Sequence, residues 1–73
     1  MPKLGRFSGR DVRSILERNG FAFTRQKGSH MVMQKVEGDS TVTAIVPDHK
    51  ELRISTLQSI IRQSRLPRAM FEV

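Results

Sequence analysis

The segment from Phe21 to Pro47, FAFTRQKGSHMVMQKVEGDSTVTAIVP, decides the fold. Its first six residues alternate with the period of a strand, Phe21, Phe23 and Arg25 against Ala22, Thr24 and Gln26. The break at residues 27–29 leads into a second extended run over 30–36, and two such runs around a short glycine-containing break predict a hairpin. A turn signal at 37–40 precedes a β-branched run over 41–46, which Pro47 ends because proline cannot donate to a ladder. The segment therefore predicts three antiparallel strands.

The third run indicates which side of this sheet is buried. Its apolar side chains fall on one face, at Val42, Ala44 and Val46. In the second run, Met31 and Met33 are more typical of a core than of a functional methionine surface. Val32 between them leaves the inward face of this strand open. If the methionines face inward, His30 faces outward.

A helix is predicted before the sheet, over about residues 9–19. Ser8 can serve as its N-cap, with Asp11 three residues on as an imperfect capping-box partner. An apolar stripe at helical spacing follows, and Asn19-Gly20 supplies a C-terminal stop.

A second helix is predicted after the charged connection of residues 47–53, over about residues 56–64. Ser55 and Gln58 have the spacing of a second capping box, and the apolar stripe consists of Leu57, Ile60 and Ile61. Pro67 permits a short final turn that would bury Met70 and Phe71.

The resulting order is α-β-β-β-α, which predicts a two-layer α+β domain. A three-stranded antiparallel sheet cannot bury its apolar face alone, so we expect both helices to pack on that face. Double-stranded-RNA-binding domains share this order, and their second helix usually opens with a lysine-rich cluster. Here that helix opens with the uncharged residues 55–59, so a surface for shape-selective duplex binding is not evident.

Length and charge narrow the class of protein further. We expect residues 1–73 to form a single domain, and the lack of cysteine excludes disulfides and thiolate metal sites. No apolar run reaches the ~20 residues of a membrane span, and no signal peptide is evident, so we expect a cytoplasmic protein. Thirteen Lys and Arg against seven Asp and Glu give a net charge of +6, which indicates a polyanionic partner. Solubility alone would also explain the charge, and nucleic acid, a membrane surface and an acidic protein all remain open.

The Lys27-Gly28-Ser29-His30 stretch is the strongest candidate site. The imidazole of histidine titrates near neutral pH and can give or take a proton, while Lys27 and the turn amides of Gly28 and Ser29 could hold an anion beside it. This combination suits phosphodiester chemistry. The alternative is structural: His30 would open a strand with its ring hydrogen-bonded to a neighbour.

The chain closely resembles the HicA toxin family of small mRNA interferases, from about Ser8 to Phe71. The resemblance rests on three blocks in order: Gly20-Phe21 through Arg25 to Gly28-Ser29-His30, then Val46–Leu52, then Thr56–Gln63. It implies that His30 is the catalytic residue and that a HicB-type antitoxin neutralises the protein. The chain departs from the family at Ile54-Ser55, where a glycine is often found, and at Ser64-Arg65, where a small Ala-Gly pair is common.

RNA chemistry agrees with that role. RNA carries its own nucleophile, the 2′-OH, so cleavage needs a base, an acid and cations for the phosphorane charge, and in principle no metal or other cofactor. His30 is the candidate base or acid, and Lys27, Arg25 and the turn amides are candidates for phosphate binding. Arg25 and Lys27 could instead belong to a solvated hairpin end.

His49 is a possible second acid or base, provided that the end of the third strand lies near the first hairpin; otherwise it is a loop residue. Two histidines without a clustered carboxylate make a poor metal site.

These observations predict a toxin ribonuclease that acts on RNA, with mRNA as the expected substrate. A non-catalytic RNA-binding module would keep the basic face and tolerate the loss of His30. A protein that only docks an acidic partner would bind RNA weakly.

Overall fold

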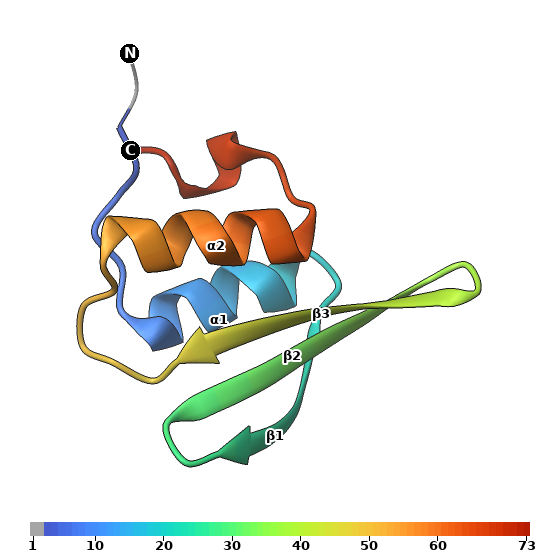
Figure 1. Ribbon diagram of the computed structural model, residues 1–73. Coiled ribbons are helices and arrows are strands. Elements are labelled where there is room, and N and C mark those ends of the chain that lie inside the picture. The colour runs from blue at the N-terminus through green and yellow to red at the C-terminus, as the bar shows by residue number, and fades with distance from the viewer. Residues whose placement is uncertain (1–2) are drawn as a thin grey trace.

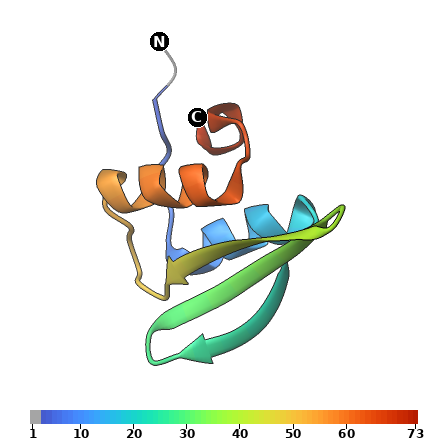
Figure 2. The ribbon, with the colours of Figure 1, turned by 45° about the vertical axis from the view of Figure 1, so that its right-hand side comes forward.

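The computed structural model describes residues 3–73, which form two layers (Figure 1). The elements are α1 (Gly9–Arg18), β1 (Ala22–Lys27), β2 (His30–Glu37), β3 (Ser40–Pro47), α2 (Ile54–Ser64) and a 3₁₀ helix, η1 (Arg68–Phe71). The strands pair antiparallel in the order β1-β2-β3. Figures 1 and 2 show both helices on the same side of this sheet. The predicted α-β-β-β-α order and α+β class are therefore confirmed.

The core lies between the helices and the sheet. Met31 and Met33 are 1% and 0% exposed and belong to it, which settles the inward face of β2. Val32 is also buried, but it pairs with Ile45 on the opposite face of the sheet. The remaining core side chains come mainly from α1, β3, α2 and η1 and include Val12, Leu16, Val42, Ala44, Val46, Leu57, Ile60 and Phe71, whereas no residue of β1 is buried.

The start of α1 follows its local sequence signal. The Ser8 hydroxyl accepts from the Asp11 amide at 3.0 Å, and the Asp11 carboxylate accepts from the Ser8 amide at 3.0 Å. This reciprocal pair is the predicted capping box, which satisfies two amides that the first turn leaves without helical partners. At the other end, the helix stops one residue before Asn19, whose side chain donates to the Ile15 carbonyl at 2.7 Å.

The prediction of a second capping box, at Ser55 and Gln58, is wrong. Helix α2 begins at Ile54 with Arg53 as its N-cap, so Ser55 lies inside the first turn, and no side chain caps the helix. The buried residue Leu52 donates its amide to the Phe7 carbonyl at 2.8 Å just before the helix. This contact with a distant segment fixes where the chain enters α2, and it overrides the local Ser55 and Gln58 pattern.

Ile54-Ser55 and Ser64-Arg65, where a departure from the resembled family is expected, lie at the ends of α2. Arg65 follows the last helical residue in the left-handed region, with φ at 60°. A glycine adopts this conformation at little cost, whereas a residue with a Cβ pays roughly 1–2 kcal/mol. The departure at Ser64-Arg65 thus affects local strain at a helix end.

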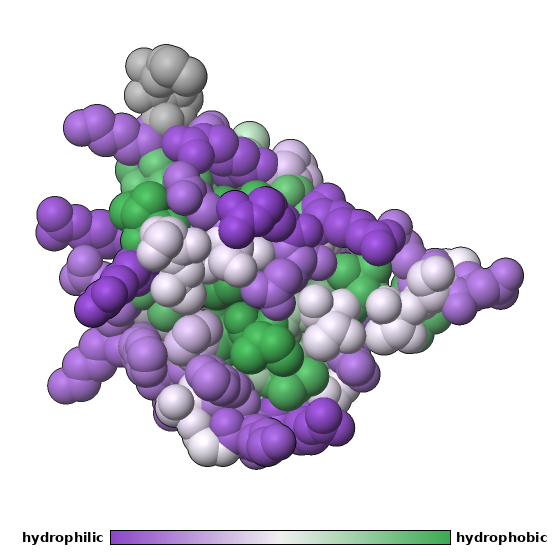
Figure 3. All heavy atoms as spheres, viewed as in Figure 1, coloured by the Kyte–Doolittle hydropathy of each residue, from purple (hydrophilic) through white to green (hydrophobic). Residues whose placement is uncertain are grey.

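The C-terminal turn closes the helical side. Phe71 is fully buried and meets Phe7 edge to face, with 6.4 Å between ring centroids. Leu4 forms a β-bridge with Glu72, which ties the two terminal segments together. Burial of Phe71 is confirmed, but burial of Met70 is wrong because that side chain is 47% exposed. Figure 3 shows that hydrophilic side chains cover most of the face seen in Figure 1, with a smaller hydrophobic area over the strands.

Candidate functional site

His30 lies at the end of the central strand, between two partners. It pairs with Lys27 of β1 on one side and with Pro47 of β3 on the other. The next residue, Met31, points into the core, and neighbouring side chains of a strand point to opposite faces. The exposed His30 side chain therefore faces away from the helices, as expected if the methionines face inward.

A β-bulge in β1 brings Arg25 to the same face. Phe23 pairs with Met33, but Arg25 pairs with Val32, so the register shifts by one residue between them. Strict alternation would place Phe23 and Arg25 on one face, and this expectation is wrong. Because cross-strand partners share a face, Arg25 joins Lys27 and His30 on the side opposite the helices. Among residues 3–73, neither Arg25 nor Lys27 makes an ion pair.

The two-residue turn between Lys27 and His30 is held from both sides. Gly28 has φ at 60°, and Ser29 does not have a positive φ, which is the pattern of a type II′ hairpin turn. The Gln26 side-chain amide donates to the Gly28 carbonyl at 3.1 Å. The Asp48 amide donates to the Ser29 carbonyl at 2.6 Å. The turn is thus fixed relative to the end of β3.

The start of α1 meets the same corner. The Gly9 amide donates to the His49 carbonyl at 2.8 Å, and Gly9 is buried. A Cβ at this position would collide with the carbonyl oxygen of Pro47. Only glycine allows so close an approach of helix and strand without a backbone shift. The role of Gly9 was not predicted from the sequence, because its position directly after the Ser8 cap does not indicate a tertiary contact.

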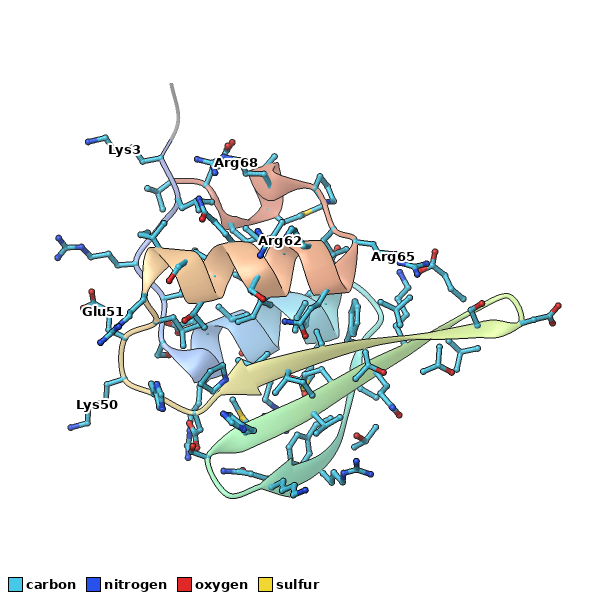
Figure 4. The ribbon with its side chains drawn as sticks, in the orientation of Figure 1. Lys3, Lys50, Glu51, Arg62, Arg65 and Arg68 are labelled. Carbon is cyan, nitrogen blue, oxygen red and sulfur yellow. The ribbon has the colours of Figure 1, made fainter. Side chains whose placement is uncertain are left out.

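His49 meets the spatial condition set by the sequence. The bond from the Asp48 amide to Ser29 brings the end of β3 beside the first hairpin. The His49 side chain is exposed and lines an open hollow of about 350 Å³ with Ser8, Arg10, Asp48 and Lys50. Figure 4 shows Lys50 projecting outward from the connection between β3 and α2. His49 is near the turn but lines a hollow that opens toward α1.

A second hollow, of about 230 Å³, lies between α1 and β1. Its lining consists of Arg10, Arg13, Ser14, Glu17, Gln26, Met31 and Asp48. Arg10, Arg13 and Glu17 were not among the candidate site residues predicted from the sequence. Their spacing puts them on one helical face, which was visible in the sequence, but the strand that they face was not.

No group of three or more His, Asp or Glu side chains within residues 3–73 is placed to hold a metal ion. In the same part of the chain, no helix combines the length and apolar character needed to cross a membrane.

Comparison with known proteins identifies the family. No curated protein matches the chain. The family model described as the HicA toxin of bacterial toxin–antitoxin systems matches residues 9–66. This span runs from the first turn of α1 to the end of α2 and includes His30, its turn and the end of β3. Because the match covers most of the 73 residues, the chain belongs to the HicA toxin family.

Proposed function

We propose that this toxin is an endoribonuclease of the mRNA interferase type that acts in the cytoplasm with His30 as its catalytic residue. The observation that supports the proposal best is the shared face of His30, Lys27 and Arg25. An exposed imidazole beside two cations that form no ion pair with the other described residues, 3–73, can move a proton next to a bound phosphate. Exposure also lets a polymeric substrate reach all three groups.

The chemistry divides between the imidazole and the cations. His30 either removes the proton of the attacking 2′-OH or protonates the leaving 5′-oxygen. Lys27 and Arg25 stabilise the charge that develops on the phosphorus oxygens, with the Gly28 and Ser29 amides as additional donors. The second proton transfer falls to His49 or to water. The scheme uses side chains and the substrate's own nucleophile, and no step requires a metal.

The substrate itself provides the test. Labelled RNA incubated with the purified toxin should be cleaved in excess chelator, because no step uses a metal. One 2′-deoxy substitution at the mapped scissile nucleotide should stop cleavage there, since it removes the nucleophile. A substrate that is cut despite this substitution would contradict the 2′-OH mechanism. Binding without any cleavage would favour a non-catalytic RNA-binding module.

A toxin of this kind needs an inhibitor in its own cell. We expect a HicB-type antitoxin with an acidic surface that covers His30 and the Lys27-Gly28-Ser29 turn. Charge complementarity with the net charge of +6 should speed association at low salt. Contacts buried around His30 should set the dissociation rate.

Competition tests this occlusion. The complex should neither bind nor cleave RNA, and RNA in excess should slow antitoxin binding. A complex that cleaves RNA at the rate of the free toxin, or in which His30 stays as accessible to chemical modification as in the free toxin, would rule occlusion out. Salt-independent RNA binding would contradict the role of the basic face, because neutralising each single-strand phosphate contributes a log–log slope of about −0.7.

A further inference from the structure

We propose that the hollow between α1 and β1 is a subsite for one nucleotide of the RNA. In this subsite Arg13 stacks against the base and Arg10 binds a phosphate. The inference rests on the proposed function, because it extends the path of the same RNA beyond His30. It adds a binding site that the catalytic groups do not include.

Arg13 is held as a planar platform. Its guanidinium carbon lies 4.1 Å from the centroid of the Phe23 ring, within the range of a cation–π contact. Its Nε lies 3.4 Å from Glu17, one turn along the helix. The Arg13 side chain is 34% exposed, so it is restrained but not enclosed. The guanidinium lies over the Phe23 ring, and the side chain also lines the hollow, which suits stacking of an unpaired base.

Arg10 is available to a phosphate. Its side chain is 81% exposed, and its Nε lies 3.4 Å from Asp48. An exposed ion pair of this length contributes little, so a phosphate can displace the carboxylate at small cost. Arg10 and Arg13 lie three residues apart on one face of α1, so both cations line the same hollow.

The hollow adjoins the turn before His30 on the helical side of the sheet. Gln26 lines it, and the Gln26 amide donates to the carbonyl of Gly28, two residues before His30. Asp48 also lines the hollow, and its backbone amide holds Ser29. An RNA strand that passes from His30 around the end of the hairpin to the helical side of the sheet therefore reaches the hollow.

The lining favours a nucleotide over an acidic peptide. A peptide carboxylate would use the cations but not the guanidinium plane, whereas a nucleotide uses both. Glu17 and the oxygen of the Gln26 side chain are acceptors, which suit the N–H donors on a base edge.

A cycle of protein and RNA changes tests the stacking. The RNA is a labelled single strand, either intact or with an abasic nucleotide at one position at a time. Binding is measured by fluorescence anisotropy. All proteins carry His30→Ala, so that the RNA is not cleaved during the measurement. At one position near the scissile bond, the abasic change should weaken binding about tenfold. In Arg13→Ala this penalty should disappear at that position only.

Two controls separate stacking from charge and from misfolding. Arg62→Ala removes the same charge from α2 and should retain the tenfold abasic penalty. Arg13→Lys keeps the charge but loses the plane, so it should lose the penalty while its thermal unfolding stays close to that of wild type. An equal abasic penalty in wild-type and Arg13 proteins would overturn the subsite, as would a penalty retained by Arg13→Lys.

The outcomes also distinguish this subsite from the proposed function. If the wild-type toxin cleaves RNA but the abasic penalty does not depend on Arg13 at any position, the ribonuclease proposal stands and the subsite fails. If coupling is found but RNA is never cleaved, the subsite stands and the catalytic proposal fails. If an acidic peptide protects Arg10 and Arg13 from chemical modification of their guanidinium groups and RNA does not, the assignment of the hollow to a nucleotide fails.

Discussion

Two basic regions of this toxin differ in what accompanies their charge. At the hairpin end of the sheet, Arg25 and Lys27 share a face with His30. On the helical side, Figure 4 shows Arg62, Arg65 and Arg68 on α2 and the segment after it. There Arg68 is paired with Glu72 at 2.9 Å, and Arg62 lines an open hollow with Gln58 and Ile61. The comparison teaches that net charge alone does not distinguish the two regions; an imidazole and a fixed turn beside the cations make the hairpin end the candidate site.

The largest expected effect concerns the two histidines. His30→Ala should reduce the cleavage rate about 10²–10⁴-fold, because a general acid or base is lost. His49→Ala should reduce it less than about tenfold if water can make the second proton transfer. Initial rates on labelled RNA measure both, and thermal unfolding should change little because both side chains are exposed.

Either of two results would change this assignment. An equal loss in His49→Ala would identify His49 as the second acid or base. Wild-type cleavage by His30→Ala would remove His30 from the mechanism and with it the distinction between the two basic regions.

The next largest effect on cleavage is expected when two positive charges are removed from the hairpin end, compared with two removed from the helical side. Arg25→Gln with Lys27→Gln should lower kcat/KM roughly 10–100-fold, because at each position a neutral hydrogen bond to phosphate replaces a charge-assisted one and is weaker by about 1 kcal/mol. Arg62→Gln with Arg65→Gln removes the same charge from α2 and should lower kcat/KM less than about threefold. Similar losses in both double variants would show that RNA responds only to total charge.

Substitutions of Gly9 and Gly38 test whether the contact between α1 and the end of β3 supports cleavage as well as stability. Gly9→Ala should lower the free energy of unfolding by about 1–3 kcal/mol, because the added Cβ collides with Pro47 and overpacks the contact. It should also reduce cleavage, since this contact packs α1 against the end of β3, where the Asp48 amide holds the turn before His30.

Gly38→Ala is the matched control at the far hairpin, which projects away from the helices (Figure 1). Gly38 has φ at 58° with no neighbouring atom within 4 Å of an added Cβ, so the cost is backbone strain of roughly 1–2 kcal/mol. Urea unfolding should show destabilisation of both variants, with cleavage by the folded protein lowered in Gly9→Ala alone. Equal cleavage by both folded proteins would mean that the Gly9 contact does not position the site.

The smallest effect compares the starts of the two helices. Ser8→Ala should lower the free energy of unfolding by about 1 kcal/mol, because it removes a hydrogen-bonded cap. Ser55→Ala should change the free energy by less than about 0.5 kcal/mol, because Ser55 caps nothing. Thermal or urea unfolding measures both, and equal costs would contradict the observed start of α2.

Local signals explain which parts of the fold were predictable. The capping box at Ser8 and the turn at Gly28 act over two to four residues, so the neighbouring sequence contains all the groups involved. The predicted start of α2 was wrong because the contact that fixes it joins Leu52 to Phe7, which is far away in the chain. The predicted burial of Met70 was wrong for a similar reason, since the turn that buries Phe71 leaves its neighbour Met70 exposed.

The sequence by itself determined the order of the elements, the family blocks and His30 as the candidate catalytic group. Only the tertiary structure decided that a bulge at Thr24 turns Arg25 to the face of His30, that Gly9 joins α1 to the end of β3, and that Arg13 lies on Phe23. Periodicity and caps report the preferences of adjacent residues. Strand register and contacts between elements depend on how distant surfaces pack, and no short stretch of this chain contains both sides of those contacts.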